Sequence, residues 1–214
     1  GGSGGAEAEV IEYITIASTG NATDFGNLVS PGAYKASCSN GSRGIWAGEE
    51  YSGESNEIDY VTISTPSNAT DFGDLTRATK RAGASSDGTK GVFAGGVASS
   101  TRQNTIDYIT IATTGNATDF GDLSAARERI GGVSNGTRGI YGGGAEGSAV
   151  NIIEYIVIAT TGNATDFGDL TNSRNSPGAT GSTTRGVFAG GNTGSLDDTI
   201  DYITIATIGT AVEF

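Results

Sequence analysis

The chain has 214 residues, with 24 acidic and 12 basic side chains and a formal net charge of −12 at pH 7. This charge repels phosphate backbones, so the sequence predicts no nucleic-acid partner. The sequence contains no histidine, which excludes Ser-His-Asp and Cys-His catalysis and removes the commonest zinc ligand. Apolar runs stay below the roughly 18 residues of a membrane-spanning helix, so we expect no membrane insertion.

The chain opens on a glycine-rich stretch that differs from all that follows. Residues 1–5 (GGSGG) have the composition of a flexible linker, and we expect residues 1–9 to lie outside the fold. Residues 10–214 are expected to form a single domain, because one repeat domain of this length is ordinary for an all-β fold. Since the sequence contains no methionine, we expect the native N-terminus to have been removed.

Three short strings recur through the rest of the chain. The string I-(E/D)-Y-(I/V)-(T/V)-I begins at Ile11, Ile58, Ile106, Ile153 and Ile200. The string N-A-T-D-F-G-(N/D)-L begins at Asn21, Asn68, Asn116 and Asn163. The string (R/K)-G-(I/V)-(W/F/Y)-(A/G)-G begins at Arg43, Lys90, Arg138 and Arg185. The period is close to that of four-stranded propeller blades, roughly 40 to 50 residues, so the repetition predicts an all-β propeller.

Each repeat is expected to contribute four short strands. Residues 106–113 are rich in β-branched and aromatic side chains and predict a strand buried between neighbours, here named strand three. Residues 117–123 follow a turn and predict strand four. Residues 131–134 and 138–141 flank an Asn-Gly turn and predict a hairpin of strands one and two. No part of the repeat has helical periodicity.

Strand three has five copies and strand two only four, which leaves one repeat incomplete. Residues 10–28 therefore predict a two-strand half-blade ahead of four complete units. Unpaired strand edges need cover, which leaves three arrangements: five blade positions with one thin blade, a four-bladed ring with an accessory hairpin, or a dimer that associates through the incomplete blades. We favour five positions, and we expect residues 10–28 to pack against residues 201–214 across the ring seam.

The strand that ends in two glycines resembles the kelch repeat, whose fold is a β-propeller. In two repeats it occurs as G-V-F-A-G-G, at residues 91–96 and 186–191. A variable loop follows in each repeat, and then a strand that carries a tyrosine; these tyrosines are Tyr60, Tyr108, Tyr155 and Tyr202. Over residues 10–214 the unit is similar to kelch-like repeat proteins of tailed bacteriophages, notably those of marine cyanobacteria. The resemblance implies a virion-associated or tail-fibre-like protein. Gly48-Glu49 departs from the diglycine of the kelch pattern.

Repeated charged residues suggest sites that we weigh against structural roles. The aspartate pairs supply two side chains where Ca²⁺ needs about six to eight ligands, so we expect turn and salt-bridge roles and neither metal nor cofactor; they are Asp71/Asp74, Asp119/Asp122 and Asp166/Asp169. The D-F-G triplet of protein kinases recurs here without a nucleotide loop and predicts no kinase activity. The cation before each strand two is expected to pair with a repeat-fixed aspartate, the alternative being a positive ring for an anionic ligand.

Binding is expected where the repeats disagree, because loops on a rigid scaffold carry recognition. These segments are residues 29–37, 49–56, 76–81, 97–104, 145–151 and 192–198. Tyr51 has no aromatic counterpart in the other repeats and is the predicted ligand-binding residue. Trp46 and Cys38 are interpreted as packing residues. The N-A-T asparagines match the N-glycosylation acceptor, but their tolerance of turn geometry explains them better.

Two classes of function remain. The first is a non-enzymatic virion or surface component, in the virion or extracellular, whose propeller binds a protein partner or a host-surface glycan. The alternative is a lectin-like carbohydrate-binding propeller with one site per repeat. A lectin needs an identical exposed cluster in every repeat, whereas the identical residues here belong to expected strand cores and turns. The first class is therefore favoured, and no catalytic residue is predicted.

Overall fold

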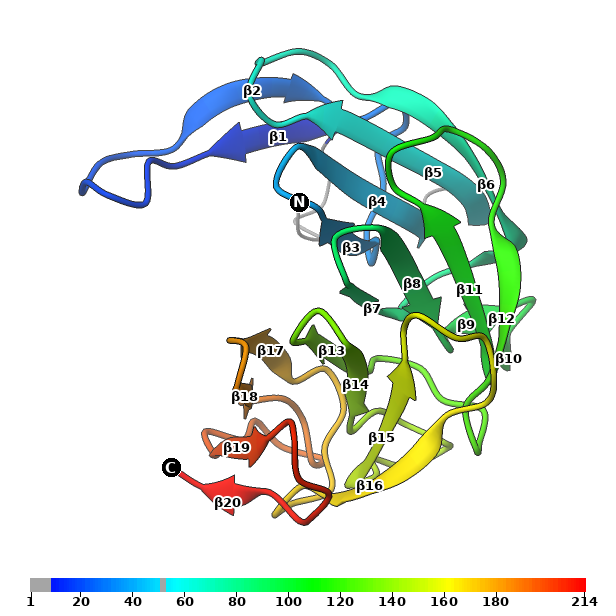
Figure 1. The fold of residues 1–214 in the computed structure, drawn as a ribbon, viewed down its shortest axis with the longest axis vertical. Coiled ribbons are helices and arrows are strands. Elements are labelled where there is room, and N and C mark those ends of the chain that lie inside the picture. The colour runs from blue at the N-terminus through cyan, green and yellow to red at the C-terminus, as the bar shows by residue number, and fades with distance from the viewer. Residues whose placement is uncertain (1–8, 51–52) are drawn as a thin grey trace.

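The computed structural model describes residues 9–50 and 53–214, and the regular structure of this part is entirely β (Figure 1). Its twenty strands form four four-stranded and two two-stranded antiparallel sheets. The all-β prediction is therefore confirmed for the described residues. Over the same residues no helix is long and apolar enough to span a membrane. The linker predicted at residues 1–9 lies, apart from Glu9, outside the described part.

The strands follow the chain from sheet to sheet. The N-terminal hairpin contains β1 (Val10–Tyr13) and β2 (Thr23–Asn27). The first sheet contains β3 (Ala36–Ser39), β4 (Arg43–Glu50), β5 (Glu54–Thr62) and β6 (Thr70–Thr79). The second contains β7 (Gly83–Ser86), β8 (Lys90–Ala94), β11 (Thr105–Thr110) and β12 (Thr118–Asp122), with β9 (Val97–Ala98) and β10 (Thr101–Arg102) forming a ribbon beside it. The third contains β13 (Gly131–Ser134), β14 (Arg138–Gly142), β15 (Ile152–Val157) and β16 (Thr165–Asp169), and the fourth contains β17 (Gly178–Gly181), β18 (Arg185–Ala189), β19 (Ile200–Thr204) and β20 (Val212–Glu213).

The strands predicted from the repeat are confirmed with small shifts of their ends. β13 has the predicted bounds of strand one, and β14 extends strand two by one residue. β11 ends at Thr110, three residues earlier than predicted for strand three, because the backbone N–H of Thr113 donates to the Thr110 carbonyl and closes a turn. Residues 10–28 form the predicted two-strand piece.

The four sheets follow one another along an arc, with their first strands on the inside and their fourth strands towards the outside (Figure 1). Inner strands of successive sheets touch each other, β3 with β7, β7 with β13, and β13 with β17. Ser86 Oγ of β7 donates to the Ser39 carbonyl of β3 at 2.9 Å, and Ser134 Oγ of β13 donates to the Ser86 carbonyl at 2.5 Å. The inner edge of the arc is thereby joined from sheet to sheet.

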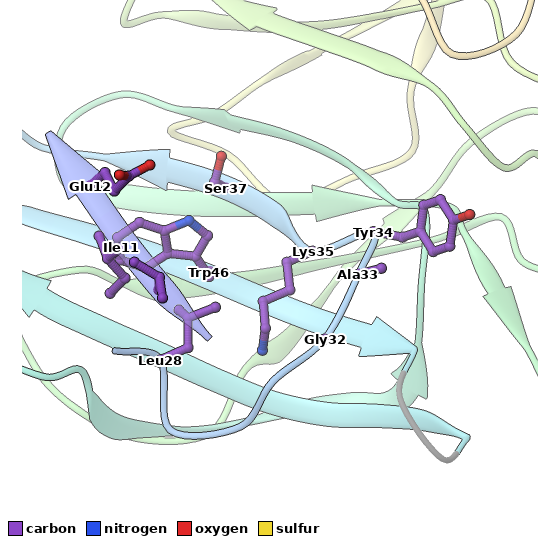
Figure 2. A pocket seen from close by; sticks show the side chains of 10 residues that line it. Ile11, Glu12, Leu28, Gly32, Ala33, Tyr34, Lys35, Ser37 and Trp46 are labelled. Carbon is purple, nitrogen blue, oxygen red and sulfur yellow. The ribbon is translucent and has the colours of Figure 1, made fainter. Parts of the chain in front are cut away.

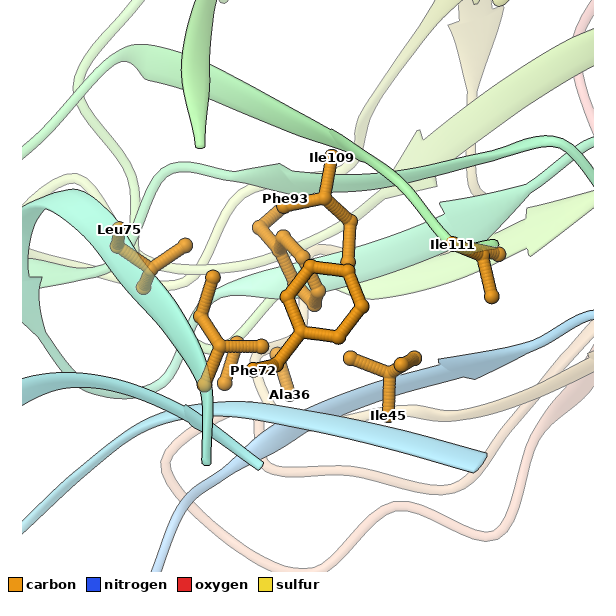
Figure 3. Packing of buried hydrophobic residues seen from close by; sticks show 9 residues of the cluster. Ala36, Ile45, Phe72, Leu75, Phe93, Ile109 and Ile111 are labelled. Carbon is orange, nitrogen blue, oxygen red and sulfur yellow. The ribbon is translucent and has the colours of Figure 1, made fainter. Parts of the chain in front are cut away.

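Apolar cores lie between consecutive sheets. Between the first and second sheets, Ile45, Ile58 and Phe72 pack with Phe93, Ile109 and Ile111 (Figure 3). The same arrangement recurs at the next two junctions. The recurring N-A-T-D-F-G string places a phenylalanine in an otherwise polar turn, which predicts its burial between neighbouring units. Three of these phenylalanines are only 0–3% exposed; they are Phe72, Phe120 and Phe167. That prediction is confirmed.

The D-F-G triplet has a structural explanation in these junctions. Asp71 Oδ1 accepts a hydrogen bond from Gly73 N at 3.0 Å, and the phenylalanine between them fills the core. Gly73 has φ +140°, and a Cβ there would lie 2.6 Å from the Gly115 carbonyl oxygen of the next turn. A side chain would therefore push the two sheets apart, so the position favours glycine.

The prediction that residues 10–28 pack against residues 201–214 is wrong. Figure 1 shows the N-terminal hairpin and the fourth sheet at the two ends of the arc. Ile14 and Ile16, expected to be covered, are 63% and 94% exposed, and Phe214 is 79% exposed. The arc of four sheets does not return on itself far enough to bring these side chains together.

The hairpin instead stacks on the first sheet by the same contacts that join the other sheets. The backbone N–H of Ala69, ahead of β6, donates to the Asn27 carbonyl of β2 at 2.7 Å. Between the first and second sheets, Ala117 N donates to the Asp74 carbonyl at 2.7 Å. The hairpin is therefore the outer half of a sheet in the repeat's own geometry.

Candidate functional site

A cavity of about 580 Å³ opens between the N-terminal hairpin and the first sheet, and we name it the N-terminal groove (Figure 2). Its walls combine apolar and charged side chains. They are Val10, Ile11 and Glu12 of β1, Leu28, Gly32, Ala33, Tyr34 and Lys35 of the connection to β3, Ser37 of β3 and Trp46 of β4. Several of these residues belong to the variable segment 29–37, one of the predicted recognition segments.

Within the part of the chain that the structure describes, the hairpin has strands three and four of a complete sheet without strands one and two. In the second sheet β11 pairs with β8 on one side and with β12 on the other. Within the described residues β1 pairs only with β2, so its other edge presents backbone donors and acceptors without strand partners. The groove occupies the place where a complete sheet has its two inner strands.

Trp46 lies in the wall of the groove, at the place that two inner strands cover in the complete sheets. Its counterparts Phe93, Tyr141 and Phe188 are at most 2% exposed. Strands one and two of the preceding sheet cover them, as a Cβ on Gly142 of β14 would lie 2.7 Å from the Phe188 ring. Among the described residues no strand covers Trp46 in this way, and its side chain is half-buried in the groove wall. The packing role predicted for it holds on its first-sheet side only.

Lys35 forms a buried ion cluster beside the groove. Its Nζ lies 2.5 Å from Glu49 Oε2 and 3.4 Å from Asp59 Oδ2, and the three side chains are no more than 5% exposed. Burial raises the pKa of Asp59 to about 6, and the Lys35 ammonium opposes that rise. Since one ammonium faces two carboxyl groups, the cluster carries an excess of negative charge when both are ionised.

A buried acid occurs at the second place of the strand-three string in every complete sheet. Three meet a cation from the segment just before strand one of their own sheet, and Asp107 meets Thr76 in β6 of the preceding sheet. The pairs are Asp59 with Lys35, Asp107 with Thr76, Glu154 with Arg127, and Asp201 with Arg174. Glu12 holds the same place in the hairpin and is exposed on the groove wall.

These acids were missed at the sequence level. The signal was present, because an acid recurs inside an otherwise apolar strand, where an ionised group needs a partner. The partners could not be found in the same way, since Lys35 and Thr76 stand in variable segments and only Arg127 and Arg174 share one place in the repeat. Arg127 and Arg174 are both 0% exposed, so their pairing is part of the core.

Within residues 9–50 and 53–214, none of the four cations before strand two forms a salt bridge with aspartate, contrary to our prediction. Arg43, Lys90 and Arg138 donate instead to a backbone carbonyl of the next sheet, just beyond that sheet's strand three. The donors and acceptors are Arg43 with Ile111 at 2.8 Å, Lys90 with Ile158 at 3.1 Å, and Arg138 with Ile205 at 2.8 Å. The Arg43 guanidinium also lies 4.5 Å from the Tyr60 ring centroid. The side chains are therefore engaged in joining sheets and do not form an open ring of positive charge.

The repeat-fixed asparagines also join neighbouring sheets. Their side-chain oxygens accept hydrogen bonds from backbone N–H groups of the preceding strand four. The bonds are Asn68 with Asn27 N, Asn116 with Asp74 N and Asn163 with Asp122 N, at 3.0–3.1 Å. Over residues 9–50 and 53–214, no group of three or more acidic or cysteine side chains is placed to hold a metal ion.

The predicted ligand contact Tyr51 lies outside the described residues. Cys38 is half-buried, and burial raises the pKa of its thiol to about 12, which makes it a poor nucleophile at neutral pH. Comparison of the chain with models of protein families and with curated proteins finds no match. The kelch and phage resemblance therefore stays a prediction, and the argument for function rests on the groove.

Proposed function

We propose that this chain is a non-enzymatic binding scaffold of the β-propeller type, related to the kelch-like repeat proteins of tailed phages, with one incomplete blade. Four successive four-stranded antiparallel sheets with their first strands inside an arc support the propeller assignment. A virion-associated or tail-fibre-like role, in contact with a protein partner or a host surface, is consistent with such a scaffold. The binding site in this proposal is the N-terminal groove.

The observation that carries the proposal is the edge of β1 that has no strand partner among the described residues and lies beside a cavity of about 580 Å³. An extended segment of a protein partner can add to such an edge by main-chain hydrogen bonds, while its alternate side chains enter the pocket. Ile11, Leu28 and Trp46 offer the pocket an apolar surface. The partner segment is therefore a β-strand or hairpin with at least one apolar side chain directed at Trp46.

The charged side chains around the groove restrict the kind of partner segment further. Glu12 stands on the groove wall, and the Lys35 cluster has more carboxyl groups than ammonium groups. In the complete sheets, Glu154 and Asp201 at the place of Glu12 take arginine partners. A segment that carries an arginine ahead of its strand reproduces this pairing, so the proposal selects a basic segment over an acidic one.

The test uses a peptide with the sequence of residues 127–142, which in this protein supplies Arg127 and both strands of the third sheet's inner hairpin. The emission of Trp46, the single tryptophan, is followed as peptide is added to the chain. Burial of the indole is expected to give a saturable shift to shorter wavelength. A peptide with Arg127→Glu should bind at least about tenfold more weakly, a loss of roughly 1.4 kcal/mol.

A charge exchange provides the matched control. Glu12→Arg places a cation on an exposed wall residue, and this variant should prefer the Arg127→Glu peptide over the original one. Absence of a saturable change with either peptide would contradict strand binding in the groove. A response of Trp46 to a panel of oligosaccharides, with none to the peptides, would favour the lectin-like alternative.

A further inference from the structure

The two ends of the arc carry the two halves of an interface that the molecule makes three times inside itself. At each internal junction, one sheet presents residues of strands two, three and four, and the next presents residues of its strands two and three and the residue directly after strand three. The internal sets are Ile45, Ile58 and Phe72 with Phe93, Ile109 and Ile111; Val92, Ile106 and Phe120 with Tyr141, Ile156 and Ile158; and Ile140, Ile153 and Phe167 with Phe188, Ile203 and Ile205.

The fourth sheet presents the first of these two surfaces to solvent. Its residues at the places of Ile58 and Phe72 are Ile200 and Phe214. Ile58 and Phe72 are 0% and 2% exposed, whereas Ile200 and Phe214 are 43% and 79% exposed. Val187, at the place of the fully buried Ile45, is only half-buried. We name Val187, Ile200 and Phe214 the donor face.

The N-terminal hairpin presents the second surface. Ile14 and Ile16 stand at the places of Ile109 and Ile111 in the strand-three string. Ile109 and Ile111 are 2% and 0% exposed, whereas Ile14 and Ile16 are 63% and 94% exposed. We name Ile14 and Ile16 the acceptor face. Its opposite side already packs on the first sheet, where Phe25 is 8% exposed.

A polar contact completes the match between the two faces. Arg138 lies 4.6 Å from the Tyr155 ring centroid and donates to the Ile205 carbonyl of the next sheet. Arg185 lies over Tyr202 at the same 4.6 Å, but within the described residues its side chain makes neither a hydrogen bond nor a salt bridge. The carbonyl that corresponds to that of Ile205 in the hairpin belongs to Ile16.

We propose that the donor face of one copy docks on the acceptor face of a second copy, head to tail, with the Arg185 guanidinium donating to the Ile16 carbonyl. The occupant is a second copy because the complementary surface is the chain's own hairpin, which lies at the other end of the arc within one molecule (Figure 1). The contact continues the internal junctions, so it repeats their chemistry at a new boundary. An interface of this heterologous kind can add further copies in the same direction.

Two physical terms set the strength of this association. The hairpin supplies two strands where an internal junction uses four, so docking buries a smaller apolar area. The fraction of associated chains is therefore expected to change over the chain concentrations that can be measured. The net charge of −12 makes copies repel each other. Salt screens that repulsion without weakening apolar contacts, so raising the ionic strength is expected to increase association.

The first test measures solution mass by sedimentation velocity over a range of chain concentrations. Ile16→Asp is expected to weaken association by at least about tenfold, because docking would bury its carboxylate among apolar side chains. Leu196→Asp is the matched control, since Leu196 is 91% exposed and belongs to neither face. It should associate as the unchanged chain does. A single-chain mass at all concentrations, or equal weakening by both variants, would overturn the proposal.

The second test separates docking of two copies from closure within one. Ile16→Cys and Val187→Cys are made in separate chains and in one chain, and each sample is treated with a short bis-maleimide. Ile111 and Ile45, their counterparts, share one core cluster. Mixed single variants should give a covalent dimer, and the double variant a ladder of multiples. A double variant that forms only an internally linked monomer would show that the faces meet within one chain and would sink the proposal.

Arg185→Gln provides a third readout that leaves the apolar faces intact. It should weaken association less than Ile16→Asp and leave the melting temperature of the dilute chain unchanged, because Arg185 is exposed. Arg129→Gln, also an exposed arginine, removes the same charge away from both faces. Equal effects of the two substitutions on association would mean that only the loss of a positive charge matters. The proposed hydrogen bond from Arg185 to the Ile16 carbonyl would then be excluded.

Discussion

Phe120 in the second sheet and Phe214 at the end of the fourth occupy the same place in the repeat, yet their surroundings differ. Both rings meet a tyrosine edge-on, with centroid separations of 5.8 Å to Tyr108 and 5.9 Å to Tyr202. The third sheet covers Phe120, which is 3% exposed, whereas Phe214 is 79% exposed. The ring pair is therefore formed within one sheet, and the burial is supplied by the next. In such an array, stability resides largely in the junctions between neighbours.

Substitution of alanine for phenylalanine at these two places should give the largest difference in the free energy of unfolding. Phe120→Ala is expected to lower the free energy of unfolding by roughly 3–5 kcal/mol, because it opens a cavity in a junction. Phe214→Ala should change it by no more than about 0.5 kcal/mol, since little is covered there. Urea unfolding followed by circular dichroism at low chain concentration measures both. Similar midpoints for the two variants would show that junction burial does not govern stability.

The buried acids extend the comparison to charged groups. Arg127→Met leaves Glu154, 1% exposed, without its cation, and is expected to cost about 3 kcal/mol. Glu12→Gln alters the equivalent acid where it is exposed, and should cost less than about 0.5 kcal/mol. The double variant Arg127→Met with Glu154→Leu should regain most of the loss. Failure to regain it would mean that Arg127 acts through packing and not through charge compensation.

The cations before strand two give a smaller contrast. Arg138→Gln removes a hydrogen bond to the Ile205 carbonyl and a contact with the Tyr155 ring, which together are worth about 1 to 2 kcal/mol. Arg185→Gln removes only the ring contact at an exposed position, and should be close to neutral. Thermal unfolding of the dilute variants distinguishes the two. Equal destabilisation would contradict the role of the carbonyl bond in joining sheets.

The strands and junction cores could be predicted from the sequence because short sequence patterns determine them. The Asn-Gly turn predicted the hairpin at residues 131–134 and 138–141, and the observed strands β13 and β14 agree. The constant phenylalanine of an otherwise polar turn predicted its burial, as seen for Phe120. In these cases the residues that determine the structure are neighbours along the chain.

What could not be predicted depends on the relation between sheets. Arg43 reaches Ile111, 68 positions further along the chain, so the strings alone could not reveal its acceptor. Lys35 stands in a segment that differs in every repeat, and nothing in the periodicity marks it as the partner of Asp59. The packing of residues 10–28 against residues 201–214 was mispredicted because the spacing of the repeats carries no information on the angle between successive sheets.

The last and smallest effect concerns pH and the Lys35 cluster. The pKa of Asp59 is raised to about 6 by burial, while the same group in the unfolded chain titrates near its ordinary pKa of 3.8. Between these two values the folded state binds more protons than the unfolded state, so this group adds stability as the pH falls from 7 to 5 and loses it as the pH rises through 6. The expected gain is about 1 kcal/mol.

Asp59→Asn should abolish this gain while leaving the rest of the pH dependence in place. The measurement is the free energy of unfolding of both chains at pH 5 and pH 7, compared as a difference of differences, so any fixed cost of disturbing Lys35 cancels. Asp24→Asn, at an exposed residue of the hairpin, is the control and should follow the unchanged chain. If Asp59→Asn keeps the full gain, the buried carboxyl of the first sheet titrates as an exposed one does. The difference in burial between the covered junctions and the open hairpin would then have no effect on the titration of their carboxyl groups.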